Sequence, residues 1–156
     1  MIVERAAPMV GAKPLLAVGW ATVELDRAEQ ELAYVLLPGT SFQPGPSSEH
    51  LGARCRLGWV APAFVGELAA IVVLLEASTE GRLAATLARH GEGWCATWEA
   101  TWKNPWEAGA DETAEAASRG RLSDSRSGPL GLERLHLGGR VSRPHRLAVE
   151  AATIEP

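Results

Sequence analysis

An uninterrupted apolar run at residues 68–75 most constrains how this chain can fold. The run reads Leu-Ala-Ala-Ile-Val-Val-Leu-Leu and is partly β-branched. It is too short to span a bilayer, which takes about 20 residues in a helix. A short apolar run without alternation is typical of a strand that is buried on both faces. We therefore predict a sheet in which residues 69–75 form a central strand, and we expect no membrane association.

Other strand patterns lie on both sides of this run. The segment Leu15–Val23 is rich in strand formers, and Leu51–Val60 alternates in the manner of a half-buried strand. Two short alternating segments, Leu132–Leu137 and Arg146–Ala151, predict the last two strands. The chain thus supplies several strands that can flank a central one.

Helical patterns are fewer. Residues 27–36 carry apolar side chains at helical spacing, with Asp26 as the expected N-cap and Pro38-Gly39 as the stop. A second helix is expected to open at residues 78–80 and to end at Arg89-His90-Gly91. Residues 107–119 are alanine-rich and acidic, which predicts a third helix on the surface.

Two segments are predicted to be loops. Residues 40–50 contain two prolines, a glycine and several serines, and residues 120–129 are rich in Ser, Gly and Arg, which indicates a mobile loop. The resulting order is strand, helix, strand, strand, helix, strand, helix, strand, strand. This order predicts one α+β domain over residues 1–156, with a largely antiparallel sheet.

Tryptophan is over-represented, since six tryptophans accompany one tyrosine and two phenylalanines. Four of them, Trp94, Trp98, Trp102 and Trp106, are spaced by four residues. That spacing places side chains on one face of a helix and also on one face of a strand. The intervening residues include threonines and alternate small with large, which favours a strand over residues 94–102. We expect its inner face to carry the first three indoles.

These indoles have three interpretations. They can fill the core, line a cleft that binds flat apolar or cationic small molecules, or form the centre of an oligomer interface. We expect the cleft, with Trp94, Trp98 and Trp102 as one wall and Trp20 and Trp59 as further walls. Nucleic acid is not expected as a partner, because the net charge is −4 and the local side chains are acidic.

Motifs for metal binding or nucleophilic catalysis are weak. The chain has no phosphate-binding loop, no G-x-S-x-G and no H-E-x-x-H. His136, His145 and Glu150 offer a two-histidine, one-carboxylate set, but their spacing fixes no common face. We therefore predict neither a metal nor a cofactor. Glu24 and Glu76 end predicted strands and are expected to be solvated.

The remaining sequence features concern the cellular compartment. Cys55 and Cys95 lack a C-x-x-C context and are expected to be buried thiols in a reducing compartment. Residues 1–5 show no basic region followed by a long apolar run, so no signal peptide is expected. The excess of arginine over lysine is typical of a GC-rich bacterial genome. We expect a cytoplasmic bacterial protein.

The segment Gly19–Ala28, Gly-Trp-Ala-Thr-Val-Glu-Leu-Asp-Arg-Ala, resembles the start of a glyoxalase/bleomycin-resistance module of the vicinal-oxygen-chelate superfamily. Residues 71–77 resemble the fourth strand of that module. The resemblance implies two strand-helix-strand-strand-strand modules, residues 14–93 and a degenerate second module at 94–156. Their curved, mostly antiparallel sheets would surround one cleft, and the protein would be a homodimer.

The resemblance also carries expectations about metal chemistry. Enzymes of the family usually place a metal ligand early on the first strand, where Gly19 or Trp20 stands, and a second within the fourth strand, near Val73. Glu150 on the last strand matches a third position. Because two ligands are missing, this sequence looks like the metal-free, ligand-sequestering branch that includes drug-binding resistance proteins.

We therefore expect a metal-free, small-molecule-binding protein with a tryptophan-lined apolar cleft. One alternative is a glyoxalase-like lyase, isomerase or hydrolase, whose acid–base groups would come from Glu76, Glu150, His136 or His145. A second alternative is an oligomeric or partner-binding module that uses the tryptophan face. A cone-shaped barrel of the nuclear-transport-factor type fits less well, because that family begins with a long helix.

Overall fold

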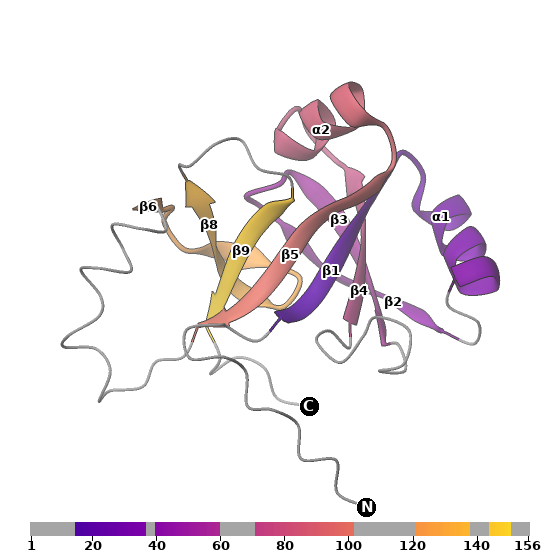
Figure 1. Ribbon diagram of the computed structural model, residues 1–156, viewed down its shortest axis with the longest axis horizontal. Helices are drawn as coiled ribbons and strands as arrows, with labels where there is room; N and C mark the ends of the chain where they lie inside the picture. The colour runs from indigo at the N-terminus through magenta and orange to yellow at the C-terminus, as the bar shows by residue number, and fades with distance from the viewer. Residues whose placement is uncertain (1–14, 37–39, 60–70, 102–120, 138–143, 151–156) are drawn as a thin grey trace, which may run out of the picture.

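The computed structural model describes residues 15–36, 40–59, 71–101, 121–137 and 144–150 (Figure 1). Within these ranges the helices are α1 (Leu25–Glu31), which continues into a π-helical turn (η1, Leu32–Leu36), and α2 (Arg82–His90). The strands of the same ranges are β1 (Leu15–Thr22), β2 (Phe42–Ser48), β3 (Ala53–Trp59), β4 (Ile71–Ala77), β5 (Gly93–Thr101), β6 (Arg121–Leu122), β7 (Arg126–Gly128), β8 (Gly131–Leu137) and β9 (His145–Glu150).

The strands form one strongly curved sheet. Its order is β2-β3-β4-β1-β5-β9-β8-β6, and β7 also pairs with β8. The β1–β4 and β5–β9 pairs are parallel, whereas the other described pairs are antiparallel. The sheet curves until its two ends approach each other, which gives a nearly barrel-shaped molecule (Figure 1). The predicted α+β fold is confirmed, and the division into two modules stays a prediction.

Strand β4 occupies the central position that its apolar run predicts. It lies between β3 and β1, and residues 71–75 are almost completely buried. Its side chains alternate between two separate cores. Val73 and Leu75 belong to the core on the concave, inner face, and Val72 and Leu74 to the core on the convex, outer face. This strand therefore links the two hydrophobic cores of the protein.

The two helices cover different parts of the sheet. Helix α1 packs on the outer face, where Leu25 and Leu32 join the side chains from β4. Helix α2 follows β4 and lies across the end of the sheet, with Leu83 in the inner core (Figure 1). The inner core also contains Trp98, which reaches inward from β5. Neither described helix is long and apolar enough to cross a membrane.

Two segments predicted as loops contain strands. Strand β2 covers most of residues 40–50, and β6 and β7 lie within residues 120–129. Pro44 and Pro46 are compatible with β2 because it lies at one end of the sheet, where part of its backbone is not needed for pairing. The loop prediction was therefore wrong, since pairing with β3 outweighed the local turn composition.

The helix boundaries also differ from the prediction. Helix α1 begins at Leu25 with Glu24 as its N-cap, so Asp26 lies in the first turn instead of capping it. Helix α2 begins at Arg82, a few residues later than expected, and ends as predicted at Gly91, whose φ is 73°. The predicted helix at residues 107–119 and Trp106 lie outside the described residues.

Candidate functional site

A fully buried glutamate lies on the inner face of the curved sheet. Glu133 is on β8, between the exposed Leu132 and Arg134, and its own exposed fraction is 0%. Its Oε1 accepts a hydrogen bond of 2.6 Å from Ser48 Oγ on β2. Its Oε2 accepts one of 2.7 Å from Trp98 Nε1 on β5. One carboxylate thus joins three strands that are not neighbours in the sheet.

The surroundings of Glu133 disfavour its charged form. Burial raises the pKa of this carboxyl, and the nearby Glu49 charge acts in the same direction. The hydrogen bonds from Ser48 and Trp98 lower the pKa, but they do not cancel the effect of burial. Both donors are neutral, and no ion pair to Glu133 forms among the described residues. A carboxyl with a raised pKa is suited to taking up and returning a proton.

The carboxylate is closely enclosed. A Cβ atom at Gly128 would lie 2.1 Å from Glu133 Oε2 and 2.2 Å from its Cδ, so only glycine fits where β7 passes the carboxylate. On the other side, a Cβ at Gly19 would lie 2.8 Å from Trp98 Cζ3 and 3.0 Å from Leu75 Cδ1. The indole of Trp98 therefore lies directly against the backbone of β1.

Trp94 and Trp98 point to opposite faces of the sheet, so the predicted single face of indoles is wrong. Gly19 pairs with Ala96, but Trp20 pairs with Trp94, which leaves one extra residue in β5. Such a bulge reverses the side to which the following residues point. Trp98 enters the inner core with an exposed fraction of 0%, whereas Trp94 is 50% exposed on the outer face.

The other tryptophans named as ligand-binding candidates are dispersed. Trp20 is half-buried beside the α1 core and meets Trp94 edge-on, with ring centroids 4.9 Å apart. Trp59 is 62% exposed at the end of β3. Trp102 lies outside the described residues. The structure brings Trp20 and Trp94 together and places Trp98 on the other side of the sheet, and a role of these side chains in ligand binding stays a prediction.

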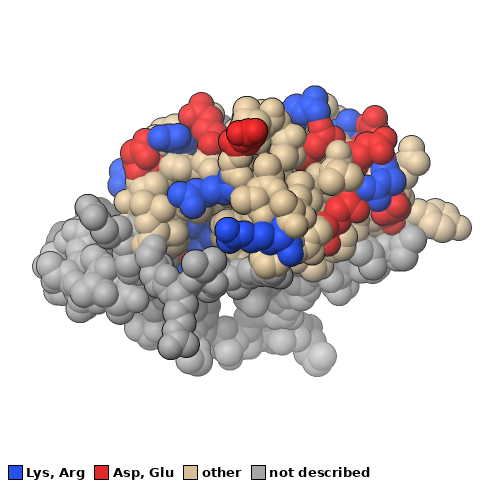
Figure 2. Space-filling model, turned by 90° about the horizontal axis from the view of Figure 1, so that it is seen from above, with Lys and Arg blue, Asp and Glu red and all other residues tan. Residues whose placement is uncertain are grey.

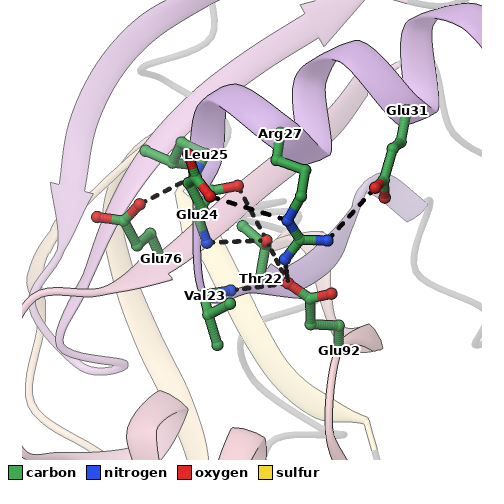
Figure 3. Close-up of polar contacts among 8 residues, drawn as sticks. All are labelled: Thr22, Val23, Glu24, Leu25, Arg27, Glu31, Glu76 and Glu92. Carbon is green, nitrogen blue, oxygen red and sulfur yellow. Dashed lines mark hydrogen bonds and ion pairs between the residues drawn. The ribbon is translucent and has the colours of Figure 1, made fainter.

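Glu76, an acid–base candidate from the sequence, binds the start of α1 and an arginine of β3. Its Oε2 accepts a hydrogen bond of 2.9 Å from Leu25 N at the start of α1 (Figure 3). Its Oε1 pairs with Arg54 on β3. The carboxylate therefore takes the place of a capping side chain, since Glu24 makes no side-chain cap. Its contacts hold α1 against β3 and β4.

Glu92 completes this polar network on the outer side. It accepts hydrogen bonds from Thr22 Oγ1 at 2.7 Å, Val23 N at 3.0 Å and Arg27 Nη2 at 2.5 Å (Figure 3). These contacts, above all the one from Arg27, lower the pKa of Glu92 to about 2. Acidic and basic side chains are interspersed over the described part of the face seen in Figure 2.

The histidines of the considered metal set lie on opposite faces. Leu135 pairs with Leu147 on the inner side, so alternation places His136 outward and His145 inward. His145 Nε2 is 2.9 Å from Thr86 Oγ1 on α2, and burial lowers the pKa of this histidine. Among the described residues, no three His, Cys, Asp or Glu side chains gather as a metal site.

Cys55 and Cys95 are buried as predicted. Each is 4% exposed, and burial raises the pKa of both thiols to about 12. They behave as small apolar core residues and offer no reactive thiolate at neutral pH.

Sequence reasoning missed Ser48 and Glu133. A signal for Glu133 was present, since it shares the alternation of Leu135 and Leu137 and so is a carboxylate on the apolar side of its strand. Ser48 gave no such signal, because it lay in a segment with loop composition. Only the curvature of the sheet brings it to Glu133.

No protein-family model matches the chain, and no curated protein matches its sequence. Several solved structures share the fold. Methylmalonyl-CoA epimerase from Mycobacterium tuberculosis matches with a TM-score of 0.67 and 19% identity, over 88% of this chain and 87% of that chain. A single-substitution variant of Streptomyces coelicolor methylmalonyl-CoA epimerase, in complex with 2-nitronate-propionyl-CoA, matches with a TM-score of 0.68 and 19% identity, over 92% of this chain and 99% of that chain. A hypothetical protein from Bacillus halodurans C-125 matches with a TM-score of 0.63 and 14% identity, over 89% of this chain and 94% of that chain.

The fold is glyoxalase-like. Methylmalonyl-CoA epimerase belongs to the vicinal-oxygen-chelate superfamily, so the resemblance noted in the sequence is confirmed at the level of the fold. At identities of 14–19%, the likeness concerns the fold alone.

A metal centre at the positions implied by this superfamily does not fit the interior. The first-strand position is Gly19 or Trp20. Gly19 offers no ligand and is covered by the indole of Trp98, and Trp20 packs beside α1 on the outer side. The fourth-strand position, near Val73, is apolar and completely buried. Metal binding there would require both a new ligand and displacement of the indole.

Proposed function

We propose that the protein is an enzyme of the isomerase or lyase type that moves a proton on a small organic substrate, with Glu133 as its general acid–base. The observation that carries this proposal is a fully buried carboxyl that receives two neutral hydrogen bonds inside the curved sheet. The fold supports it, because solved structures of this fold include epimerases in complex with CoA esters.

The proposed step is proton transfer beside a carbonyl group. The Glu133 carboxylate takes a proton from the neighbouring carbon, and the electron pair of the broken C–H bond moves to the carbonyl oxygen. The protonated Glu133 then returns the proton to the same carbon. Return to the original face restores the substrate, return after the enolate has turned its other face toward Glu133 gives the epimer, and either return regenerates the carboxylate. Burial strengthens Glu133 as a base, while Ser48 and Trp98 fix the direction of its two oxygens.

Deuterium exchange tests this proposal directly. The protein is incubated in heavy water with 2-substituted acyl-CoA thioesters, beginning with methylmalonyl-CoA, and mass spectrometry follows deuterium at the carbon beside the carbonyl. We expect exchange with the wild-type protein and at least a hundredfold slower exchange with Glu133→Gln, since general acid–base catalysis contributes about 10²–10⁴-fold.

Glu99→Gln serves as the matched control, because Glu99 pairs with Arg146 on the outer side of β5. It should leave the exchange rate unchanged. Circular dichroism checks that both variants are folded, and Ser48→Ala provides a second variant that retains the carboxyl. Absence of exchange across the thioester panel, or equal exchange in Glu133→Gln, would contradict the proposal.

The exposed aromatic pair supports a second candidate, small-molecule binding without chemistry. Trp20 and Trp94 meet edge-on at the surface, and half of Trp94 is open to solvent. Flat or cationic compounds can stack on such rings. A titration that quenches tryptophan fluorescence in the wild type but not in Trp94→Ala would favour this candidate. Homodimer formation and a cytoplasmic location stay predictions.

A further inference from the structure

The two ends of the curved sheet are joined through three consecutive residues, Ser48 to His50. Ser48 binds Glu133, Glu49 N donates a hydrogen bond of 3.0 Å to Ser127 O, and His50 Nε2 lies 2.9 Å from Asp124 O. By contrast, β3 and β4 are joined along seven paired residues. We call this junction, formed by the contacts of Ser48–His50, the seam. Within the described residues it contains few hydrogen bonds.

The segment Ser123–Gly128, which includes β7, covers Glu133 on the seam side. Its last residue, Gly128, is buried against the carboxylate, where a Cβ atom would clash. The side chains between Asp124 and Ser127 are all exposed. The segment therefore separates Glu133 from solvent while it buries little apolar surface of its own.

His50 holds this segment through hydrogen-bond contacts with Ser123 and Asp124. The Asp124 carbonyl oxygen can only accept a hydrogen bond, so His50 Nε2 carries the hydrogen that it donates. The same nitrogen lies 3.1 Å from Ser123 Oγ, which also accepts a hydrogen bond of 2.7 Å from Leu135 N. Because Nε2 is a donor here, His50 cannot activate Ser123 as a nucleophile. The two residues hold the segment to the end of β2 and to β8.

We propose that Ser123–Gly128 is a movable strap over Glu133, that the contacts of Ser48–His50 hold it closed, and that its release admits substrate to the carboxylate. Release breaks the few contacts at the seam, the short pairing of β7 with β8 and the two hydrogen bonds that join Ser123 to Leu135. Segments with exposed side chains and few buried contacts open at much lower free energy than a central strand. The turn at residues 129–130 leads into Gly131 at the start of β8, whose φ of 118° favours glycine at this end of the strap.

This inference rests on the proposed function only for the role of the substrate, so hydrogen exchange tests the motion without any activity. The amide of Glu49 reports on the strap because the Ser127 carbonyl protects it. In the wild type we expect it to exchange at least a hundredfold faster than the buried amides of β4. His50→Ala should accelerate it by a further fivefold or so, as expected for the loss of a single hydrogen bond.

His90→Ala is the matched control, since His90 is exposed at the end of α2 and lies outside the seam. It should leave the exchange of Glu49 unchanged. Exchange at Glu49 as slow as in β4, or no acceleration in His50→Ala, would overturn the strap.

A cross-link tests the role of the strap in substrate access. The pair Glu49→Cys and Ser127→Cys replaces two residues that are joined by a backbone hydrogen bond. When oxidised, this variant should lose at least tenfold in thioester exchange and recover after reduction. Full activity of the oxidised form would overturn the access role. If the wild type itself shows no thioester exchange, the proposed function fails, and the amide exchange still decides whether the strap moves.

Discussion

The inner and outer faces of the sheet hold their carboxylates in opposite ways. Glu133 on the inner side has no exposed surface and receives only neutral donors, and burial raises its pKa. Glu92 on the outer side is partly exposed and receives Arg27 together with a hydroxyl and a backbone N–H, and its pKa falls to about 2. The same type of side chain thus has a raised pKa on one face and a lowered pKa on the other.

The proposed acid–base, Glu133, therefore lies apart from the charge network of the outer face. The outer network is rich in ion pairs: those of Arg56 with Asp26 and Glu29 link β3 to α1, and that of Arg27 links α1 to Glu92. Ionised groups with satisfied partners are stable and have little reason to exchange protons. The inner carboxyl lacks a cation, so its protonation is the more easily changed by a substrate.

The largest test of this comparison is the removal of one indole from each face. Trp98→Ala should lower the free energy of unfolding by about 4 kcal/mol, because it leaves a cavity in the inner core and removes a donor from Glu133. Trp94→Ala should cost about 1 kcal/mol or less, since half of this side chain is already exposed. Urea unfolding measures both, and equal losses would show that the two faces do not differ as described.

A smaller effect is expected from adding a methyl group at Gly19, where the Trp98 ring already lies against the backbone. Gly19→Ala places a methyl group against the Trp98 ring and should cost about 2 kcal/mol. In a Trp98→Phe background the smaller ring makes room, so the same substitution should cost about 1 kcal/mol less. A double-mutant cycle from urea unfolding gives the coupling. Zero coupling would argue against the close contact of the indole with β1.

The smallest effects separate the two carboxylates by pH. The pKa of Glu92 falls from 4.5 to about 2, so its stabilising contribution is present above pH 4.5 and is lost as pH falls toward 2. Glu92→Gln should therefore cost about 1.5 kcal/mol near neutral pH and progressively less in acid. The measurement is the free energy of unfolding in urea as a function of pH.

The contribution of Glu133 to stability depends on pH in the opposite direction. Its pKa is raised, so its contribution is fully present below pH 4.5 and is lost as pH rises through the folded-state value. The difference between Glu133→Gln and the wild type should therefore shift in favour of the variant as pH increases. Parallel pH profiles of Glu92→Gln and Glu133→Gln would remove the distinction between the two faces.

Several elements were predictable because their local pattern and their tertiary environment agree. The apolar run of β4 requires burial on both faces. The strand formers of β1 and the alternation of β3 each predict a strand, as the structure has it. Strand β5 was also found from its residues. The direction of the Trp94 side chain was not predictable from the sequence. It depends on a bulge in β5 opposite Gly19–Trp20, and this bulge arises from the pairing of β5 with β1 and has no signal in the residues of β5.

The sequence by itself determined an α+β chain with a central apolar strand, buried cysteines and a resemblance to the glyoxalase-like fold. Tertiary structure alone decided that Pro44 and Pro46 lie in a strand and that Ser48 meets Glu133 across the seam. The physical reason is the range of the interactions. Periodicity and propensity act within a few residues, whereas closure of the curved sheet joins positions 85 residues apart in the chain.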